Sequence, residues 1–323
     1  MKETPGGIAT MTTLLVTHPC FVHHDTGYGH PERPDRMRAI DKALAHHHFN
    51  SLRRAEAPLR DDVEAQIMLA HPRAYLDGIK AARPAAGHLV HLDPDTVMSA
   101  GSWEAALRAV GAGLYAVDQV IDPNSGIKNA FCQVRPCGHH AEKARAMGFC
   151  LFNNVAIAGL YARAKHGAER IAVVDFDVHH GNGTQDIFWS DRDLLFGSTH
   201  QMPLYPGTGA VSETGVGNIW NAPLRPNDGG EQFREAFESR ILPALDNFAP
   251  DLVLISAGFD AHEADPLANL RLKEPDFAWA TEEICKVAER HAHGRVVSML
   301  EGGYDLSALA RSVAVHVEVL MEA

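Results

Sequence analysis

The chain has 323 residues, of which 29 are Lys or Arg and 41 are Asp or Glu, so its formal net charge at pH 7 is −12. This length suits one large α/β domain with a full core, and the acidic balance, without a run of Lys or Arg, argues against binding through nucleic-acid phosphates. The 5 cysteines have no CxxC spacing and favour a reducing cytoplasm, and no stretch approaches the ~18 apolar residues of a membrane span.

We expect a single domain over residues 11–323. Residues 1–10, MKETPGGIAT, lack the apolar core of a signal peptide and are expected to form an extension outside the fold. Short β-branched or apolar runs predict strands at 12–17, 129–134, 170–177, 193–199, 251–258 and 295–300. Segments with helical spacing lie at 33–45, 62–82, 101–121, 153–166, 231–247, 275–292 and 306–322. This alternation predicts a parallel sheet with helices on both faces.

Titratable groups gather where four of the predicted strands end. The stretches are VRPCGHHAE, DFDVHHGNG, SAGFDAHEADP and LEGGYD. In open α/β sheets, ligands bind beyond the carboxyl ends of the strands, where the loops converge. The sequence therefore predicts a functional site at this edge of the sheet.

Three of these residues suit a metal ion. Asp177 and His179 are two positions apart on an extended segment, so their side chains point the same way. Asp260, behind another apolar run, is the best candidate for a third ligand. One nitrogen and two carboxylates without a thiolate suit catalytic zinc, or ferrous iron or cobalt. Burying the acids without a cation would be unfavourable.

Further strand-end residues suit proton transfer. A neutral imidazole of His139 or His140 could take a proton from water, and a protonated one could donate to a leaving group. Asp175 and Asn182 are polar partners that could set the two charge states, because an Asp favours the imidazolium more than a neutral Asn does. Tyr304 follows two glycines, and its phenol could donate to an oxyanion.

The ordered motifs resemble one known family. RPCGHHAE, GFCLFNN, VVDFDVHHGNGTQDIF, STHQMPLYPGTG, SAGFDAHEADPL and LEGGYD are similar to the signature of the histone deacetylase superfamily, in its bacterial class II-like branch, which includes acetylpolyamine amidohydrolases. The resemblance runs from about residue 27 to the C-terminus. It implies the arginase/deacetylase fold, a single α/β domain around an eight-stranded parallel sheet.

The resemblance also assigns roles. It makes Asp177, His179 and Asp260 the zinc ligands, His139 and His140 the tandem pair backed by Asp175 and Asn182, and Tyr304 the carbonyl-polarising phenol. At the substrate it implies Gly148, Phe149, Tyr205, Leu267 and Gly302, with Gly148 and Phe149 lining a narrow tunnel opposite Tyr205. A structural potassium would use Asp175, Asp177, His179, Ser198 and Thr199, mostly through backbone oxygens. A second monovalent ion would use Phe188, Asp191 and Leu194.

Two positions depart from the family pattern. Cys137 stands where the common motif has a second proline, next to the tandem pair, so local rigidity or redox sensitivity is expected to differ. Leu267 stands seven residues after Asp260, where branch members that select polyamines carry a glutamate. Polyamine selectivity therefore lacks that support.

The leading hypothesis is zinc-dependent hydrolysis of a linear amide, which removes an acetyl or related acyl group from acetyl-lysine, an acetylpolyamine or a small amide. Either histidine could be the base, and we favour His140, which is backed by Asn182. Residues 29–36, GHPERPDR, are expected to wall the entrance or to contact a second copy in a homo-oligomer.

Two alternatives stay open. A two-manganese ureohydrolase of the arginase type needs further bridging carboxylates, but Gly181, Gly258 and His262 occupy the candidate positions. An acyl-binding module without turnover would be expected to lose the tyrosine or a metal ligand, and the sequence keeps both.

Overall fold

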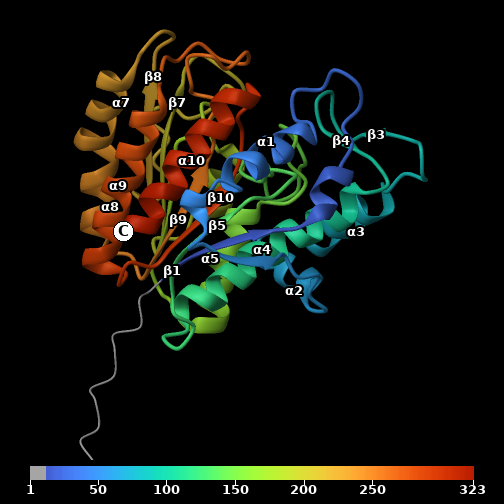
Figure 1. Ribbon diagram of the computed structural model, residues 1–323, viewed down its shortest axis with the longest axis horizontal. Helices are drawn as coiled ribbons and strands as arrows, with labels where there is room; N and C mark the ends of the chain where they lie inside the picture. The colour runs from blue at the N-terminus through green and yellow to red at the C-terminus, as the bar shows by residue number, and fades with distance from the viewer. Residues whose placement is uncertain (1–11) are drawn as a thin grey trace, which may run out of the picture.

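An eight-stranded sheet forms the centre of the molecule (Figure 1), in the order β2-β1-β5-β10-β9-β6-β7-β8. The structure is a computed structural model and describes residues 12–323, so the expected extension at 1–10 lies outside the described residues. Every neighbouring pair of strands in the sheet is parallel. The strands are β1 Thr12–Thr17, β2 Arg53–Glu56, β5 Ile127–Cys132, β6 Ile171–Asp175, β7 Leu194–Gln201, β8 Ile219–Leu224, β9 Leu252–Ala257 and β10 Val296–Leu300. The expected parallel α/β architecture with eight strands is confirmed.

The two strands at the edges of the sheet were not among those predicted from apolar runs. β2, with the sequence RRAE, is largely exposed, and within residues 12–323 its one partner strand is β1. β8 contains Pro223, and its one partner among the described strands is β7. β2 is exposed and therefore carries no apolar run, whereas the apolar run of the largely buried β8 is interrupted by Asn221 and Pro223, which an edge strand tolerates.

Helices cover both faces of the sheet (Figure 1). On one face, α4 packs on β5 and β10 while α5 packs on β6 and β9; on the other, α10 packs on β1 and β5, α9 on β9, α8 on β7 and α7 on β8. The helices are α1 Asp35–Leu44, α2 Val63–Ile67, α3 Arg73–Ala81, α4 Ser102–Ile121, α5 Asn154–His166, α6 Asn182–Phe188, α7 Gly230–Ala236, α8 Leu242–Phe248, α9 Glu274–His291 and α10 Leu306–Glu322. Central strands such as β6 and β9 are buried along their whole length because helices cover both of their faces.

Two predicted helices differ in detail. The segment predicted as one helix at 62–82 is broken into α2 and α3, since Pro72 interrupts the hydrogen-bond ladder before Arg73. The helix predicted at 231–247 contains a π-helical turn, Phe237–Ile241, between α7 and α8. Among residues 12–323, no helix has both the length and the apolar character that crossing a membrane requires.

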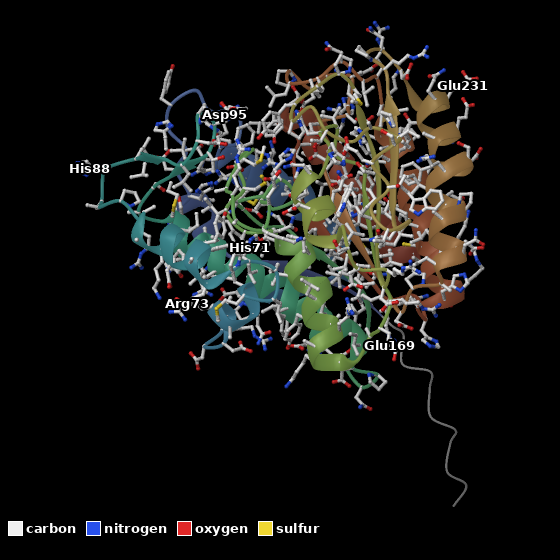
Figure 2. The ribbon with its side chains drawn as sticks, turned by 180° about the vertical axis from the view of Figure 1, so that it is seen from behind. His71, Arg73, His88, Asp95, Glu169 and Glu231 are labelled. Carbon is white, nitrogen blue, oxygen red and sulfur yellow. The ribbon has the colours of Figure 1, made fainter. Side chains whose placement is uncertain are left out.

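The strands that carry the polar stretches are neighbours in the sheet. β5, β10, β9 and β6 follow one another without interruption, so the loops after them meet at one edge. A separate pair of short antiparallel strands, β3 Val90–His91 and β4 Val97–Met98, lies in a long loop that projects beside this edge (Figure 1). Figure 2 shows His88 and Asp95 on this projecting loop.

Candidate metal centre and active site

Three side chains meet beyond the ends of β6 and β9. The Nδ1 atom of His179 lies 3.2 Å from Oδ1 of Asp177 and 3.1 Å from Oδ2 of Asp260. One ligand atom from each residue falls within 4.8 Å of the others, and all three side chains are buried. The structure thus brings together the three residues expected to bind a metal.

Backbone groups fix the two carboxylates. The N–H of Gly302 donates to Oδ2 of Asp177 at 2.8 Å, and the N–H of Val178 donates to Oδ1 of Asp260 at 2.8 Å. A Cβ added at Gly302 would lie 2.2 Å from Oδ2 of Asp260, and one at Gly258 would lie 2.0 Å from Oδ2 of Asp177. Both glycines are therefore needed so that the backbone can approach the carboxylates.

The charge of this cluster suits a cation. Burial and the charge of Asp177 raise the pKa of Asp260 to about 7. Burial opposes protonation of His179, but its hydrogen bonds to the two carboxylates raise its pKa to about 10. Two buried carboxylates side by side are unfavourable unless positive charge lies between them. The donor set, with one imidazole nitrogen and two carboxylates, fits a divalent transition-metal ion at an open site.

The tandem histidines have different partners. Nδ1 of His139 lies 2.9 Å from Oδ2 of Asp175, and Nδ1 of His140 lies 2.8 Å from Oδ1 of Asn182. Burial would lower the pKa of His139, but the charges of Asp177 and Asp175 outweigh it and hold that pKa well above 6.5. Burial and the positive charge of His139 hold the pKa of His140 well below 6.5. The expected pairing of each histidine with its polar partner is present.

The tautomer of His140 follows from its neighbours. The amide nitrogen of Asn182 donates to Oε1 of Glu142 at 2.8 Å, which orients the amide so that its oxygen faces His140. The Nδ1–H of His140 therefore donates to Asn182. Its Nε2 is left without a proton and is free to act as a base.

Two buried acids that sequence reasoning did not assign hold the site loops. Oε2 of Glu301 accepts the N–H groups of Gly138 at 2.7 Å and His139 at 3.2 Å, and burial raises the pKa of Glu301 to about 7. Oδ2 of Asp265 accepts the N–H of Tyr304 at 2.7 Å. Both acids lie within the polar stretches, but their roles depend on backbone groups that no residue pattern reveals.

Tyr304 is also supported from behind. The guanidinium of Arg36 lies 5.1 Å from the centre of the Tyr304 ring, and its Nε donates to the Gly303 carbonyl at 2.7 Å. Arg36 and Arg135 both bond to the carboxylate of Glu32, and all three side chains are fully buried. Glu32 and Arg36 lie in the GHPERPDR stretch and Arg135 in RPCGHHAE, but the sequence does not show that the three side chains meet.

His71 braces the loop that carries the tandem pair. Its Nδ1 lies 3.0 Å from the Lys143 carbonyl, and its Nε2 accepts the N–H of Asn153 at 3.0 Å. His71 is buried inside the molecule (Figure 2). Burial lowers its pKa to about 4, so it is a neutral structural residue.

A cavity of about 570 Å³ opens above the three-residue cluster. His140, His179 and Tyr304 lie at its inner end, and aromatic rings line it. Its other lining residues are Thr26, Tyr28, Gly29, His30, Pro31, His91, Pro94, Asp95, Val97, Gly148, Phe149, Leu204, Tyr205 and Leu267. Of the five residues expected at the substrate, Gly148, Phe149, Tyr205 and Leu267 line the cavity. Gly302 does not, because its backbone lies against the carboxylates instead.

The residues expected to bind monovalent ions are also placed. Asp175 and Ser198 are paired in register between β6 and β7, and the hydroxyl of Thr199 is buried without a hydrogen-bond partner among the described residues. The carbonyls of Phe188, Asp191 and Leu194 converge, and the side-chain amide of Asn218 lies 2.6–3.0 Å from all of them. The second ion expected there would therefore compete with the amide for the same oxygens.

Comparisons with known proteins agree with this geometry. A family model described as the histone deacetylase domain matches residues 30–320. The chain belongs to the histone deacetylase family. A histone deacetylase-like amidohydrolase of Pseudomonas aeruginosa is 39% identical over 290 residues, which cover 88% of this chain and 75% of that protein. A chloroplastic histone deacetylase 10 of Oryza sativa is 39% identical over 317 residues, covering 93% of this chain and 71% of that protein.

A solved structure matches the whole deacetylase fold. The crystal structure of the HDA15 HD domain superposes with a TM-score of 0.89 at 33% sequence identity, covering 97% of this chain and 89% of that one. Family membership supports deacetylase-type hydrolase activity. The expected cytoplasmic location stays a prediction, since relatives in this family include chloroplastic proteins.

Proposed function

We propose that the protein is a zinc-dependent amidohydrolase that removes an acetyl or related acyl group from an amine. The observation that carries the proposal is the arrangement at the inner end of the cavity, where His140, His179 and Tyr304 face one space. A base, a metal-ligand set and a phenol donor around one cavity are the groups that amide hydrolysis requires.

Asp177, His179 and Asp260 would hold the zinc ion. When bound, zinc supplies Lewis acidity that polarises an acyl carbonyl and lowers the pKa of water. Iron or cobalt would suit the same donors. A structural potassium beside β6 and β7 is part of the proposal, through the residues given for it above.

The protein groups supply the proton transfers. The unprotonated Nε2 of His140 accepts the proton of the water that attacks the acyl carbon. The Tyr304 hydroxyl donates a hydrogen bond to the carbonyl oxygen as negative charge develops there. The protonated His140 then donates to the nitrogen of the leaving amine. His139 does not line the cavity, so its role is to hold positive charge beside the site with Asp175.

A two-manganese ureohydrolase is disfavoured by the same geometry. A side chain at Gly181 would lie 2.3 Å from Oδ2 of Asp175, and one at Gly258 would lie 2.0 Å from Oδ2 of Asp177. A bridging carboxylate therefore does not fit at either position without displacing a carboxylate already present. An acyl-binding module without turnover is disfavoured because His140, oriented by Asn182, and Tyr304 supply the base and the hydrogen-bond donor that hydrolysis uses.

The test is the variant Tyr304→Phe, assayed with a fluorogenic acetyl-lysine amide. We expect kcat to fall by about 10²–10³, the usual effect of removing one oxyanion donor, while metal content is unchanged. Tyr161→Phe is the matched control, since its hydroxyl bonds to Asp118 outside the cavity. One transition-metal ion per chain and loss of turnover with chelator are expected; an unchanged kcat in Tyr304→Phe, or two manganese ions per chain, contradicts the proposal.

Kinetics with a panel of acylated amines identify the amine. Ranking acetylated peptides, acetylpolyamines and simple anilides by kcat/KM distinguishes the substrate classes. Because Leu267 lines the cavity where a glutamate would attract a second ammonium group, we expect no strong preference for polyamines.

A further inference from the structure

Two buried thiols lie in contact beside the proposed active site. The Sγ atoms of Cys137 and Cys150 are 3.4 Å apart, and the two residues are 3% and 0% exposed. Both thiols face the carbonyl of Gly148, at 3.9 Å from Cys137 and 3.3 Å from Cys150. The two cysteines come from different segments of the loop after β5 and are held together by the fold.

We propose that Cys137 and Cys150 form a reversible disulfide that switches the hydrolase off under peroxide. A disulfide requires a sulfur–sulfur distance of about 2.05 Å, so the two atoms must approach by about 1.3 Å from their present 3.4 Å. A small shift of either segment is sufficient, because both sulfurs already point at each other across a van der Waals contact.

The oxidant is a hydroperoxide, and the disulfide forms in two steps. One thiol attacks the peroxide oxygen, the O–O bond breaks, and the products are a sulfenic acid and water or an alcohol. The second thiol then attacks the sulfenic sulfur, the S–S bond forms, and water leaves. Two thiols are oxidised by two electrons and one peroxide is reduced. Cys137, the more exposed of the pair, is the residue that meets the peroxide first.

Burial limits which reagents reach the pair. Burial raises the pKa of Cys150 well above its ordinary value, so its thiolate is scarce and the first attack on peroxide falls to Cys137. The cavity touches Gly148, Phe149 and Tyr304, and the thiols lie directly behind the Gly148 carbonyl. Neither cysteine lines the cavity, so a peroxide, which is smaller than most thiol reagents, must pass the Gly148 backbone to reach them.

The disulfide would disturb the groups that the proposed function uses. The backbone of Gly148 is packed against His140, since a Cβ added there would lie 2.4 Å from the imidazole Cδ2. Phe149, which lines the cavity, immediately precedes Cys150 and has a φ of 70°. Drawing Cys150 toward Cys137 therefore moves the cavity wall relative to His140. This consequence for turnover rests on the proposed function, whereas disulfide formation does not.

The experiment tests disulfide formation separately from the loss of turnover. The isolated protein is treated with hydrogen peroxide and then denatured in the presence of N-ethylmaleimide, which blocks the remaining thiols. A non-reduced digest is analysed by mass spectrometry. We expect a peptide pair linked through Cys137 and Cys150, lost after dithiothreitol. Absence of that linked pair, with both cysteines still alkylated after denaturation, overturns the proposal whatever the activity of the enzyme.

Activity is measured on the same samples. A displacement of about 1 Å at a catalytic site lowers the rate by up to about a hundredfold, so we expect at least a tenfold loss that dithiothreitol reverses. Cys137→Ala and Cys150→Ala should resist peroxide, and Cys285→Ala, the matched control outside the cavity, should remain sensitive. Equal sensitivity of Cys137→Ala and the wild type overturns the switch. If untreated protein shows no amidase activity, the proposed function fails and the linked peptide still decides the modification.

Discussion

The substitution Gly302→Ala tests the proposed metal centre without removing any ligand. Gly302 does not have a positive φ, so alanine is compatible with its backbone and the effect is steric. The new Cβ would lie 2.2 Å from Oδ2 of Asp260 and 2.6 Å from Oδ2 of Asp177. Both oxygens belong to the residues that would hold the ion.

The size of the effect follows from these distances. Ordinary contact begins at 3.4 Å, so the Asp260 oxygen must move by about 1.2 Å and the Asp177 oxygen by about 0.8 Å. Metal–ligand distances tolerate only about 0.2 Å. We therefore expect affinity for zinc to fall by about 10- to 100-fold, as for losses of supporting contacts around metal ligands. This corresponds to about 1.4–2.8 kcal/mol of binding free energy.

The assay is a competition titration of metal-free protein against a chromophoric chelator, with circular dichroism to confirm the fold. Gly78→Ala is the matched control, because a Cβ at Gly78 meets no atom within 4 Å. We expect its zinc affinity to equal that of the wild type. If Gly302→Ala folds normally and binds zinc as tightly as the control, the two carboxylates do not share the ion and the reasoning is refuted.

Three further predictions concern charge and stability. His316 is fully buried, and burial lowers its pKa from 6.5 to about 3. Its neutral form therefore stabilises the fold above pH 6.5, and this stabilisation is lost as the pH falls from 6.5 toward 3. Between pH 7 and pH 5 the free energy of unfolding, measured in urea, should fall by about 2 kcal/mol less in His316→Gln than in the wild type. Glu32→Gln leaves the buried Arg135 uncompensated and should lower the free energy of unfolding by about 3–5 kcal/mol; a loss under 1 kcal/mol would contradict this. Asn182→Asp places a carboxylate against His140 and should move the acidic limb of the kcat/KM profile up by about one pH unit or more at unchanged metal content; an unmoved limb would exclude His140 as the base.

The central sheet could be predicted because burial on both faces leaves a simple pattern. β6 and β9 carry continuous apolar runs, and their order relative to the helices fixes a parallel arrangement. β2 and β8 were not predicted because an edge strand needs no such run. The break between α2 and α3 escaped because helical spacing continues across Pro72, and only the proline marks it.

The proposed metal ligands were predictable for a related reason. The strands that end in polar stretches are neighbours in the sheet, so residues that are far apart in the sequence meet at one edge. Glu301 and Asp265 were missed because they act on backbone N–H groups, which carry no sequence signal. Gly302 was placed at the substrate, although the glycine is needed for close approach to Asp260. The cavity mouth depends on loop conformations that follow from long-range packing rather than local pattern.

The hydrogen-bond partners of the buried acids explain how the site keeps negative charge for the proposed metal. In the described part of the chain, no Lys or Arg bonds to the buried carboxylates of the centre, namely Asp175, Asp177, Asp260, Asp265 and Glu301. Backbone N–H groups and histidines bond to them instead, while Arg36 and Arg135 are both bound to Glu32 behind Tyr304. N–H dipoles orient a carboxylate without cancelling its full charge. An arginine at the centre would compete with the metal, whereas one behind the phenol only positions it, and this segregation leaves the inner end of the cavity able to bind a divalent ion.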